Sequence, residues 1–395
     1  MFPCSTTVAP SRVAARVPMP DAGGVYDVAI VGAGPAGSAA AVAAATAGAR
    51  VLLLDRDDFP RDKTCGDGIA QQGLDVLAGL GVTGVTDGYA PIRSLRLTAP
   101  GGAEAARPLP EAAYTIPRQV FDARLVGAAV AAGARLARHT VRAVTVRPDR
   151  VDLGDGVAAR VVIGADGANS VVRRALGLPR NPRGHLAVAL RGYAPAAGMA
   201  AEQRIVMTGR RWPAYAWSFP IGDGRRNVGY GELTAGSGLS REHLIGRMHE
   251  LLGDTDPATV TALRAHHLPL STWRPAPGHG RVLLAGDALS LVNPFTGEGI
   301  FYAVLSGALA GAAARHGEHA GAAYTRALRD RMARHLRHTG VIARATAAPW
   351  VVDAGIRAAA ADQRVFDGFV GLGLGDGLLT ARLLGAVTRA VLRRS

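Results

Sequence analysis

The chain has 395 residues, which is enough to bury a sizeable core and to form two domains. Its apolar content of 48% and charged content of 19% are typical of a globular protein. The net charge is +14, and every basic residue except Lys63 is an arginine. Because these arginines are scattered without interleaved aromatic residues, we expect no nucleic-acid partner; anionic lipid or a diphosphate substrate suits the charge better.

The N-terminal segment and the cysteines limit the cellular setting. Residues 1–24 contain prolines and small residues but no apolar core of a signal peptide, so we expect a disordered tail. The longest uncharged run, Val28–Ala49, has the length of a membrane span but includes a glycine turn and is rich in alanine. Cys4 and Cys65 form neither a disulfide framework nor a metal-ligand cluster. We therefore expect a cytoplasmic protein without a metal site.

The first folded segment, Val25–Asp55, has the pattern strand, glycine turn, helix, strand. Val28–Val31 is an apolar run typical of a buried parallel strand, and an alanine-rich helix is expected at Ser38–Ala49. The next strand, Val51–Leu54, ends in Asp55. This acid falls about 20 residues past the turn, where a ribose-binding carboxylate belongs.

The turn between strand and helix has the sequence Gly32-Ala33-Gly34-Pro35-Ala36-Gly37. Gly32 permits the tight turn, Gly34 lets the backbone approach a pyrophosphate, and Gly37 lets helix and strand pack closely. The helix N-terminus adds free N–H groups and a partial positive charge. Together with Asp55, the segment predicts a dinucleotide site.

The middle of the chain changes character twice. A polar, turn-forming stretch at 56–68 is followed by helices and strands that lead away from the nucleotide unit, and a buried-strand pattern returns at Val161–Ser170. Helices are expected at Gln71–Leu80, Arg118–Ala132, Val171–Leu176, Arg241–Leu252 and Ala258–His266. Strands are expected at Pro91–Leu97 with a partner in its glycine- and proline-rich sequel, and at Arg135–Val146, Val151–Leu153, His185–Tyr193, Gln203–Thr208, Ala214–Phe219 and Asn227–Leu233.

Near the end, Arg281–Ala288 again shows the apolar-strand pattern of the nucleotide-binding segments, and from Gly299 onward the pattern is almost wholly helical. Three separate segments, Ile30–Gly37, Ile163–Ser170 and Leu284–Asp287, share an apolar strand that ends in Gly or Asp. Strand ends that meet at one edge of a parallel sheet form its ligand crevice. One such acid alone is more often a helix cap. Together with Arg118 and Arg173, the acids Asp166 and Asp287 predict a shared ligand site.

These segments resemble the flavin oxidoreductases with the para-hydroxybenzoate hydroxylase fold over Val25–Ser306. Asp166-Gly167 with Ser170 and Arg173 is similar to that family's second FAD motif, and Gly286-Asp287 is similar to its third, whose Asp contacts the FAD ribitol. Arg118 resembles the arginine that touches the ribose and phosphate region of the cofactor. The resemblance implies FAD as the cofactor.

Within this fold the chain resembles the geranylgeranyl reductase family more closely. The stretch from Phe59 to Gly68 is similar to its lysine-x-cysteine-glycine-aspartate-glycine signature, and Tyr215–Pro220 fits its Y-x-W-x-F-P motif. Asn227-Val228-Gly229 and Val292–Ile300 also look like family motifs. Glu298 is a departure, because glycine is frequent there in relatives, and it makes the polarity beside the flavin unusual.

The resemblance implies the roles of the site residues. The cofactor-binding set is Gly32, Gly34, Ala36, Gly37, Asp55, Arg56, Lys63, Cys65, Gly66, Asp67, Arg118, Asp166, Gly286, Asp287, Pro294, Gly297, Gly299 and Ile300. The candidate catalytic residues are Cys65, Tyr215 and Trp217, and the candidate substrate-binding residues are Tyr215, Trp217, Phe219 and Asn227. Because Tyr215, Trp217 and Phe219 alternate, they lie on one face of a strand, either packed against a helix or as a flat wall for a hydrocarbon chain. Cys65 is either an inert small apolar residue or a group over the flavin that guides substrate or proton.

The predicted architecture is α/β, with a discontinuous Rossmann-like FAD-binding domain at 25–180 and 275–340. Residues 181–274 are expected to form an antiparallel β substrate domain, with 91–115 as a candidate addition, and 341–395 a C-terminal helical region. A terminal helix at Gly377–Arg394 places Arg382, Arg389 and Arg393 on one stripe beside an apolar arc. This helix either packs on its own domain or rests on an anionic membrane.

The predicted function is reduction of carbon–carbon double bonds in an apolar, prenyl-type substrate, with hydride from N5 of reduced FAD and with NADPH or another reductant as the electron donor. A monooxygenase on the same fold is the alternative, and anaerobic turnover separates the two. A halogenase fits less well, because its catalytic lysine would have to be Lys63, which already belongs to the cysteine–glycine signature. A non-catalytic flavin or lipid carrier is the alternative from another class, and a bound flavin that no donor reduces would indicate it.

Overall fold

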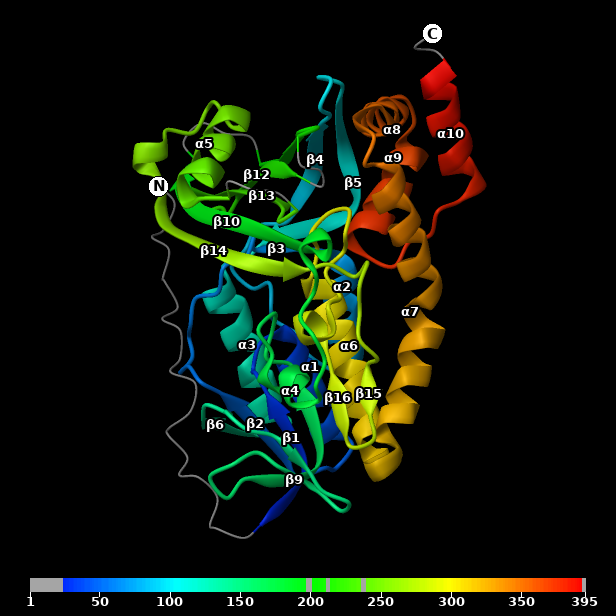
Figure 1. Ribbon diagram of the computed structural model, residues 1–395. Coiled ribbons are helices and arrows are strands. Elements are labelled where there is room, and N and C mark those ends of the chain that lie inside the picture. The colour runs from blue at the N-terminus through cyan, green and yellow to red at the C-terminus, as the bar shows by residue number, and fades with distance from the viewer. Residues whose placement is uncertain (1–23, 197–200, 211–213, 236–238, 393–395) are drawn as a thin grey trace.

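The computed structural model describes residues 24–196, 201–210, 214–235 and 239–392 (Figure 1). The predicted tail, except Gly24, lies outside the described residues. The nucleotide-type sheet occupies the lower half of the molecule in Figure 1, the second sheet the upper half, and the C-terminal helices one side. The chain is therefore a mixed α/β protein with a C-terminal helical region, as its sequence predicts.

The first sheet is built around β1 (Val25–Val31), which pairs in parallel with β2 (Val51–Asp55) on one side and β9 (Ala158–Gly164) on the other. The strand order is β15-β16-β9-β1-β2-β6, with β8 and β7 attached beside β9. The remaining strands are β6 (Arg135–Arg138), β7 (Thr145–Val146), β8 (Val151–Asp152), β15 (Gly278–His279) and β16 (Val282–Leu284). Since β1, β2, β9 and β16 run parallel, their carboxyl ends meet at one edge, where the predicted ligand crevice belongs.

The predicted strand Arg135–Val146 is not continuous. It ends at Arg138, and the chain returns to the sheet only at β7. Between them, His139, Thr140 and Val141 leave the sheet to line a cavity. The alternation of apolar and polar residues predicts strands but does not show where a strand is interrupted to form a wall.

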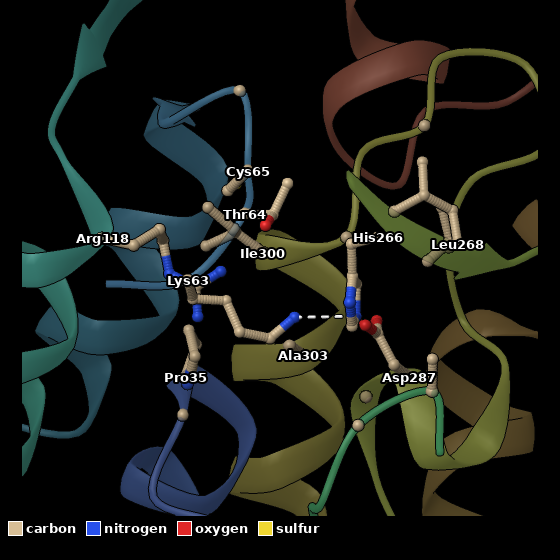
Figure 2. A pocket seen from close by; sticks show the side chains of 18 of the residues that line it. Pro35, Lys63, Thr64, Cys65, Arg118, His266, Leu268, Asp287, Ile300 and Ala303 are labelled. Atoms are coloured by element: carbon tan, nitrogen blue, oxygen red, sulfur yellow. Dashed lines mark hydrogen bonds between the residues drawn. The ribbon is translucent and has the colours of Figure 1, made fainter. Parts of the chain in front are cut away.

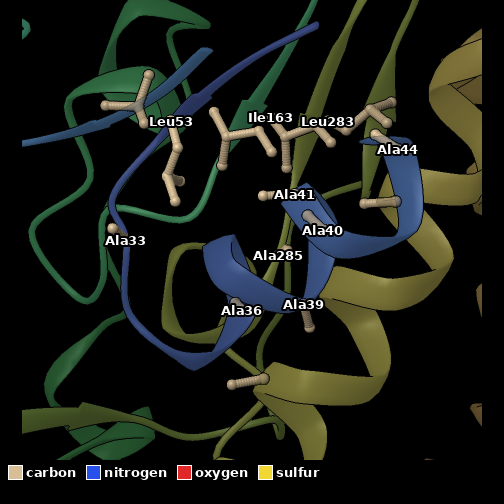
Figure 3. Close-up of a cluster of buried hydrophobic side chains, with 14 of the residues drawn as sticks. Ala33, Ala36, Ala39, Ala40, Ala41, Ala44, Leu53, Ile163, Leu283 and Ala285 are labelled. Carbon is tan, nitrogen blue, oxygen red and sulfur yellow. The ribbon is translucent and has the colours of Figure 1, made fainter. Parts of the chain in front are cut away.

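Helix α1 (Pro35–Thr46) begins inside the glycine motif, three residues before the predicted start, because the fixed φ of proline suits the first helical position. It packs on α6 (Ile300–Ala313), and a Cβ on Gly307 of α6 would lie 2.0 Å from the Ala36 carbonyl oxygen. Figure 3 shows the alanines of α1 against Leu53, Ile163 and Leu283 of the sheet. Three further helices that contribute to this core are α2 (Gln71–Gly79), α3 (Arg118–Ala131) and α4 (Val171–Ala175).

The second sheet has the order β14-β10-β13-β12-β11-β4-β5-β3. It is antiparallel except for the parallel pair β11–β4, so residues from before α3 are joined to the middle of the chain. Its strands are β3 (Gly68–Ile69), β4 (Ile92–Thr98), β5 (Glu104–Thr115), β10 (Leu186–Pro195), β11 (Gln203–Met207), β12 (Tyr215–Pro220), β13 (Arg225–Leu233) and β14 (Thr261–Pro269). Helix α5 (Arg241–Leu251) packs on this sheet through Leu244 and Met248.

The prediction of a helix at Ala258–His266 is wrong. A short 3₁₀ turn at Pro257–Thr259 leads into β14, which pairs with β10 along most of its length. Ala, Leu and Arg favour a helix locally, but pairing satisfies the open backbone groups of β10, and this tertiary contact overrides the weak local preference.

The C-terminal part is helical, as predicted. It comprises α7 (Ala320–Ala345), α8 (Pro349–Ala361), α9 (Gln363–Leu374) and α10 (Ala381–Leu392), and further 3₁₀ turns lie at Arg183–His185, Gly286–Leu289 and Ala314–His319. Leu383 and Ala386 of α10 pack with buried residues of α8 and α9. Among the described helices, none combines the length and apolar character needed to cross a membrane.

Candidate active site

A cavity of about 460 Å³ extends from the glycine turn of the first sheet to the side chains of the second sheet. Its walls come from segments far apart in the chain, and Figure 2 shows Pro35, Lys63, Arg118, His266 and Asp287 around it. The crevice at the carboxyl ends of the parallel strands and the face of the second sheet therefore belong to one site.

The glycine turn forms one end of the cavity with space for a phosphate. A Cβ on Gly34 would meet only the guanidinium nitrogens of Arg61 and Arg118, at 3.7 and 3.9 Å. No side chain caps α1, so the N–H groups at its start remain available to an anion. A Cβ on Gly37 would instead lie 1.7 Å from the Gly32 carbonyl oxygen, which is the close helix–strand contact that the motif predicts.

The acids of the three motifs lie along this end of the cavity. Asp55 Oδ2 accepts a hydrogen bond from Ala33 N at 2.8 Å, which ties the acid to the turn. Asp166 binds the N–H groups of Val171 and Val172 through Oδ2, but its buried Oδ1 has no hydrogen-bond partner among the described residues. Burial raises the pKa of Asp166. A dinucleotide with hydroxyl donors fits this orphan acceptor and the space beside Gly34.

Two arginines give this end of the cavity a positive wall. Arg118 donates to both carboxylate oxygens of Asp122, one turn later in α3, at 2.6 and 2.7 Å. Arg61 reaches the same Asp122 at 3.2 Å and Asp55 at 3.7 Å. The buried acid holds both guanidinium groups where the phosphates of a dinucleotide would lie.

A buried polar network behind the cavity wall fixes the loop that carries Cys65. Asp67 accepts hydrogen bonds from Tyr193 at 2.7 Å and Asn227 at 2.8 Å, and Asn227 also donates to the Cys65 carbonyl oxygen. Desolvation raises the pKa of Asp67 to about 6. Desolvation also raises the pKa of the Cys65 thiol, which therefore stays protonated. The network positions the loop and leaves Cys65 at the cavity wall.

Lys63 crosses the cavity to the second sheet. Its Nζ lies 2.9 Å from His266 Nε2 on β14, as the dashed line in Figure 2 shows. Desolvation and the neighbouring Lys63 lower the pKa of His266 to about 3, so the imidazole is neutral and accepts a hydrogen bond from Lys63 Nζ. Desolvation also lowers the pKa of Lys63, although Asp287 opposes this shift.

The aromatic residues of β12 line the other end of the cavity. Trp217 is 5% exposed, donates to Asn227 Oδ1 at 2.8 Å, and fits beside Gly229, where a Cβ would lie 2.2 Å from its ring. Phe219 packs against Gly68, and Tyr215 donates to the Thr296 carbonyl oxygen. Trp217 is thus both core and wall, and Leu268 and Val292 continue the apolar lining.

The segment Pro294–Ile300 closes the site at the start of α6. Gly297 has a φ of 71°, and a Cβ there would lie 2.6 Å from the Tyr215 hydroxyl, so glycine is required. Phe301 N donates to Glu298 Oε1 at 2.8 Å. Desolvation nevertheless raises the pKa of Glu298 to about 7.

The structure brings most of the predicted site residues to the cavity. All of them line it except Gly37, Asp67 and Asn227, which lie behind its walls in the contacts described above. The prediction did not include Arg61, Asp122 and His266. The spacing of Arg118 and Asp122 is a signal for their pair, whereas His266 was assigned to a helix and gave none.

The fold and the cavity define a class, and comparison with known proteins agrees. The model of the FAD binding domain family matches residues 25–306, so the protein is an FAD-dependent oxidoreductase. A menaquinone reductase of Mycolicibacterium smegmatis is 35% identical over 314 residues, covering 72% of this chain and 75% of the relative. A digeranylgeranylglycerophospholipid reductase of Methanopyrus kandleri is 33% identical over 347 residues, covering 82% and 90%. The chain belongs to the geranylgeranyl reductase family of FAD-dependent oxidoreductases.

A solved structure supports the fold over nearly the whole chain. A geranylgeranyl bacteriochlorophyll reductase-like protein from Thermoplasma acidophilum superposes with a TM-score of 0.75 at 21% sequence identity, covering 93% of this chain and 96% of that one. The likeness therefore extends beyond the FAD binding domain into the C-terminal helices.

Proposed function

We propose that the protein reduces carbon–carbon double bonds in the isoprenoid chain of an apolar, prenyl-type substrate. When bound, reduced FAD supplies a hydride from N5. The chain's own residues hold the cofactor at the glycine turn, align the hydrocarbon along β12, and exclude water from the reacting carbons. The names of the two curated relatives support this substrate class.

The observation that carries the proposal is that one cavity has two chemically different ends. The end at Gly34, Arg61 and Arg118 offers N–H groups and positive charge, as phosphates require. The end at Trp217, Phe219 and Leu268 offers flat apolar surface, as a hydrocarbon requires. A reaction between a dinucleotide and a prenyl chain needs both ends within one cavity.

The test is anaerobic incubation of the chemically reduced holoenzyme with a panel of prenyl alcohols, prenyl diphosphates and menaquinones. Mass spectrometry should show products that have gained one H₂ for each reduced double bond. If no prenyl compound gains hydrogen, and hydroxylated products form only when oxygen is admitted, the monooxygenase alternative replaces this proposal.

We further propose NADPH as the electron donor, with another reductant as the alternative. The sequence has a single dinucleotide fingerprint, which FAD takes, so the nicotinamide would bind only transiently. Anaerobic mixing of the oxidised holoenzyme with NADPH, NADH or reduced ferredoxin should bleach the flavin absorbance only with the true donor.

We also propose that the C-terminal helices contact an anionic membrane, where a prenyl lipid substrate resides. Leu384 and Leu392 on α10 are 54% and 67% exposed, and Arg382 and Arg389 are exposed on the same helix. Apolar side chains beside arginines match the interface of an anionic bilayer.

A further inference from the structure

We propose that Glu298 is the catalytic acid of the reduction and holds the proton that the second carbon of the double bond receives. This inference rests on the proposed function. Reduction of a double bond needs a hydride and a proton; the cofactor supplies the hydride, so the proton is assigned to a residue of the chain. Glu298 lines the cavity at the start of α6, beside the wall that Tyr215 and Cys65 form.

The geometry holds the carboxyl in a defined orientation. Phe301 N donates to Oε1 at 2.8 Å, so this oxygen is occupied as an acceptor and the proton of the neutral acid lies on Oε2. Thr296 Oγ1 accepts from the backbone N–H of Glu298 at 3.3 Å, which fixes the turn that carries the side chain. The carboxyl is therefore a preorganised donor rather than a mobile surface group.

Burial, opposed by the groups that face Glu298, brings this carboxyl close to half-protonation near neutral pH. Desolvation raises its pKa to about 7, while the N–H groups of Ile300 and Phe301 and the cation of Arg118 oppose the shift. Tyr215 from β12 and Tyr302 from α6 lie near it, and both phenols keep their protons because burial raises their pKa values. A proton donor works best when its pKa is near the working pH.

The other titratable groups of the cavity serve less well as acids. The thiol of Cys65 and the phenol of Tyr215 hold their protons too tightly, and the Tyr215 hydroxyl already donates to the Thr296 carbonyl oxygen. Lys63 directs its ammonium group to His266, which is neutral. Asp67 is bound by Tyr193 and Asn227 behind the wall.

The step balances with these partners. The π bond of the alkene breaks, one carbon takes the hydride supplied by reduced flavin, and the other takes the proton of Glu298, so that two C–H bonds form. The alkene is reduced by two electrons and the flavin is oxidised. Glu298 is left as a carboxylate, which takes a proton from water when the product leaves.

The test uses the FAD-loaded enzyme, reduced anaerobically with dithionite and mixed with geranylgeranyl diphosphate. We compare the wild type with Glu298→Gln, which has the same shape but no acidic proton, and with Glu298→Asp. Glu250→Gln is the control, because Glu250 lies on the exposed side of α5. Flavin absorbance gives the single-turnover rate, and the FAD content and melting temperature of each variant show that it is folded.

The proposal expects a rate for Glu298→Gln about 100-fold or more below that of the wild type, with partial recovery in Glu298→Asp. The wild-type rate should fall as pH rises through about 7, and this step should be absent in Glu298→Gln. An infrared carboxyl band of the holoenzyme that titrates in the same range should vanish in the Gln variant.

Two results would overturn the proposal and are distinguishable. If the wild type reduces the alkene and Glu298→Gln does so at the same rate with the same pH profile, another group supplies the proton while the reductase function stands. If the wild type reduces neither geranylgeranyl diphosphate nor any other compound of the prenyl panel, the reductase function fails and this role falls with it.

Discussion

A carboxyl group that keeps its proton near neutrality also changes how stability depends on pH. The pKa of Glu298 is raised from 4.5 to about 7 in the folded chain, so the folded state retains a proton that the unfolded state releases. The free energy of unfolding due to this group is therefore highest below about pH 4.5 and decreases as pH rises to about 7.

We expect Glu298→Gln to remove this dependence. Melting temperatures of the wild type and the variant, measured between about pH 4 and pH 8, should show the wild type losing stability relative to the variant as pH rises through the window. Asp67 contributes in the same direction over a lower range, and the difference between the two proteins cancels it. A constant difference across the range would mean that folding does not change the pKa of Glu298.

The second prediction at this scale concerns Trp217, whose ring is packed beside Gly229 and whose Nε1 binds Asn227. Trp217→Ala should cost roughly 3–5 kcal/mol of stability because it leaves a cavity. It should also slow turnover of long prenyl substrates far more than it weakens FAD binding. Trp217→Phe is the control, because it keeps most of the packing. If Trp217→Ala loses FAD while the remaining holoenzyme turns over normally, Trp217 belongs to the core and not to the substrate pocket.

Single residues were predictable where one local rule decides their place. Gly32, Gly34 and Asp55 follow from the strand-turn-helix pattern alone, and their surroundings have the space and contacts that it implies. His266 follows from no local rule, because its contact with Lys63 joins residues 203 positions apart. Likewise, the motif around Asn227 did not reveal that this residue lies behind Trp217 rather than on the cavity surface.

At the scale of elements, the start of α1 separates cofactor binding from folding. Gly34 has a φ of −74° and open space at its Cβ position, so Gly34→Ala should fold normally but place a methyl group where the phosphates approach. We expect colourless protein whose melting temperature equals that of the wild-type apoprotein, measured by absorbance and thermal unfolding. A yellow Gly34→Ala protein that retains FAD would place the phosphates elsewhere.

Two further glycine variants, one in α1 and one in α3, serve as controls for Gly34→Ala. Gly37→Ala should fail to fold, because its Cβ would lie 1.7 Å from the Gly32 carbonyl oxygen. Gly127→Ala in α3, with nothing within 4 Å, should keep FAD and gain a fraction of a kcal/mol of stability, since alanine has the better helix propensity by about 1 kcal/mol.

Elements with a strong repeating pattern were predictable, and those defined by a distant partner were not. The helices α3 and α5 lie within one residue of their predicted ends, because apolar periodicity and flanking turns define them. In contrast, β14 exists because the edge of β10 needs a partner, and local propensity favoured a helix. The sequence named 91–115 as a candidate addition to the second sheet but did not predict the parallel pairing of β4 with β11, since the two strands are separated by the whole of α3 and β9.

At the scale of the whole molecule, the exposed apolar side chains are unevenly distributed. Among the described residues, Val341, Trp350, Leu384 and Leu392 belong to α7, α8 and α10, and Val146 on β7 is the remaining large one. The sequence predicted an amphipathic terminal helix that either packs or binds lipid. The structure shows that Leu383 and Ala386 pack inward while Leu384 and Leu392 remain exposed. The helix therefore has one face that packs on its own domain and one exposed apolar face that is available to lipid.

The final prediction is that this surface binds anionic vesicles. Each exposed arginine near such a membrane adds about 1 kcal/mol to the binding free energy, and salt weakens the attraction, while the leucines insert among the lipids.

The double variant Leu384→Ser, Leu392→Ser should lose flotation with phosphatidylglycerol vesicles, because both side chains are exposed and their loss leaves the packed face intact. Val146→Ser is the control, as it removes an apolar side chain about as exposed as Leu384 from the first sheet, away from α10, and should float like the wild type. The wild type should float at low salt, less at high salt, and poorly with phosphatidylcholine alone. If the wild type stays in solution with anionic vesicles at low salt, α10 serves only to pack against α8 and α9, and the substrate must reach the cavity from solution or from a carrier.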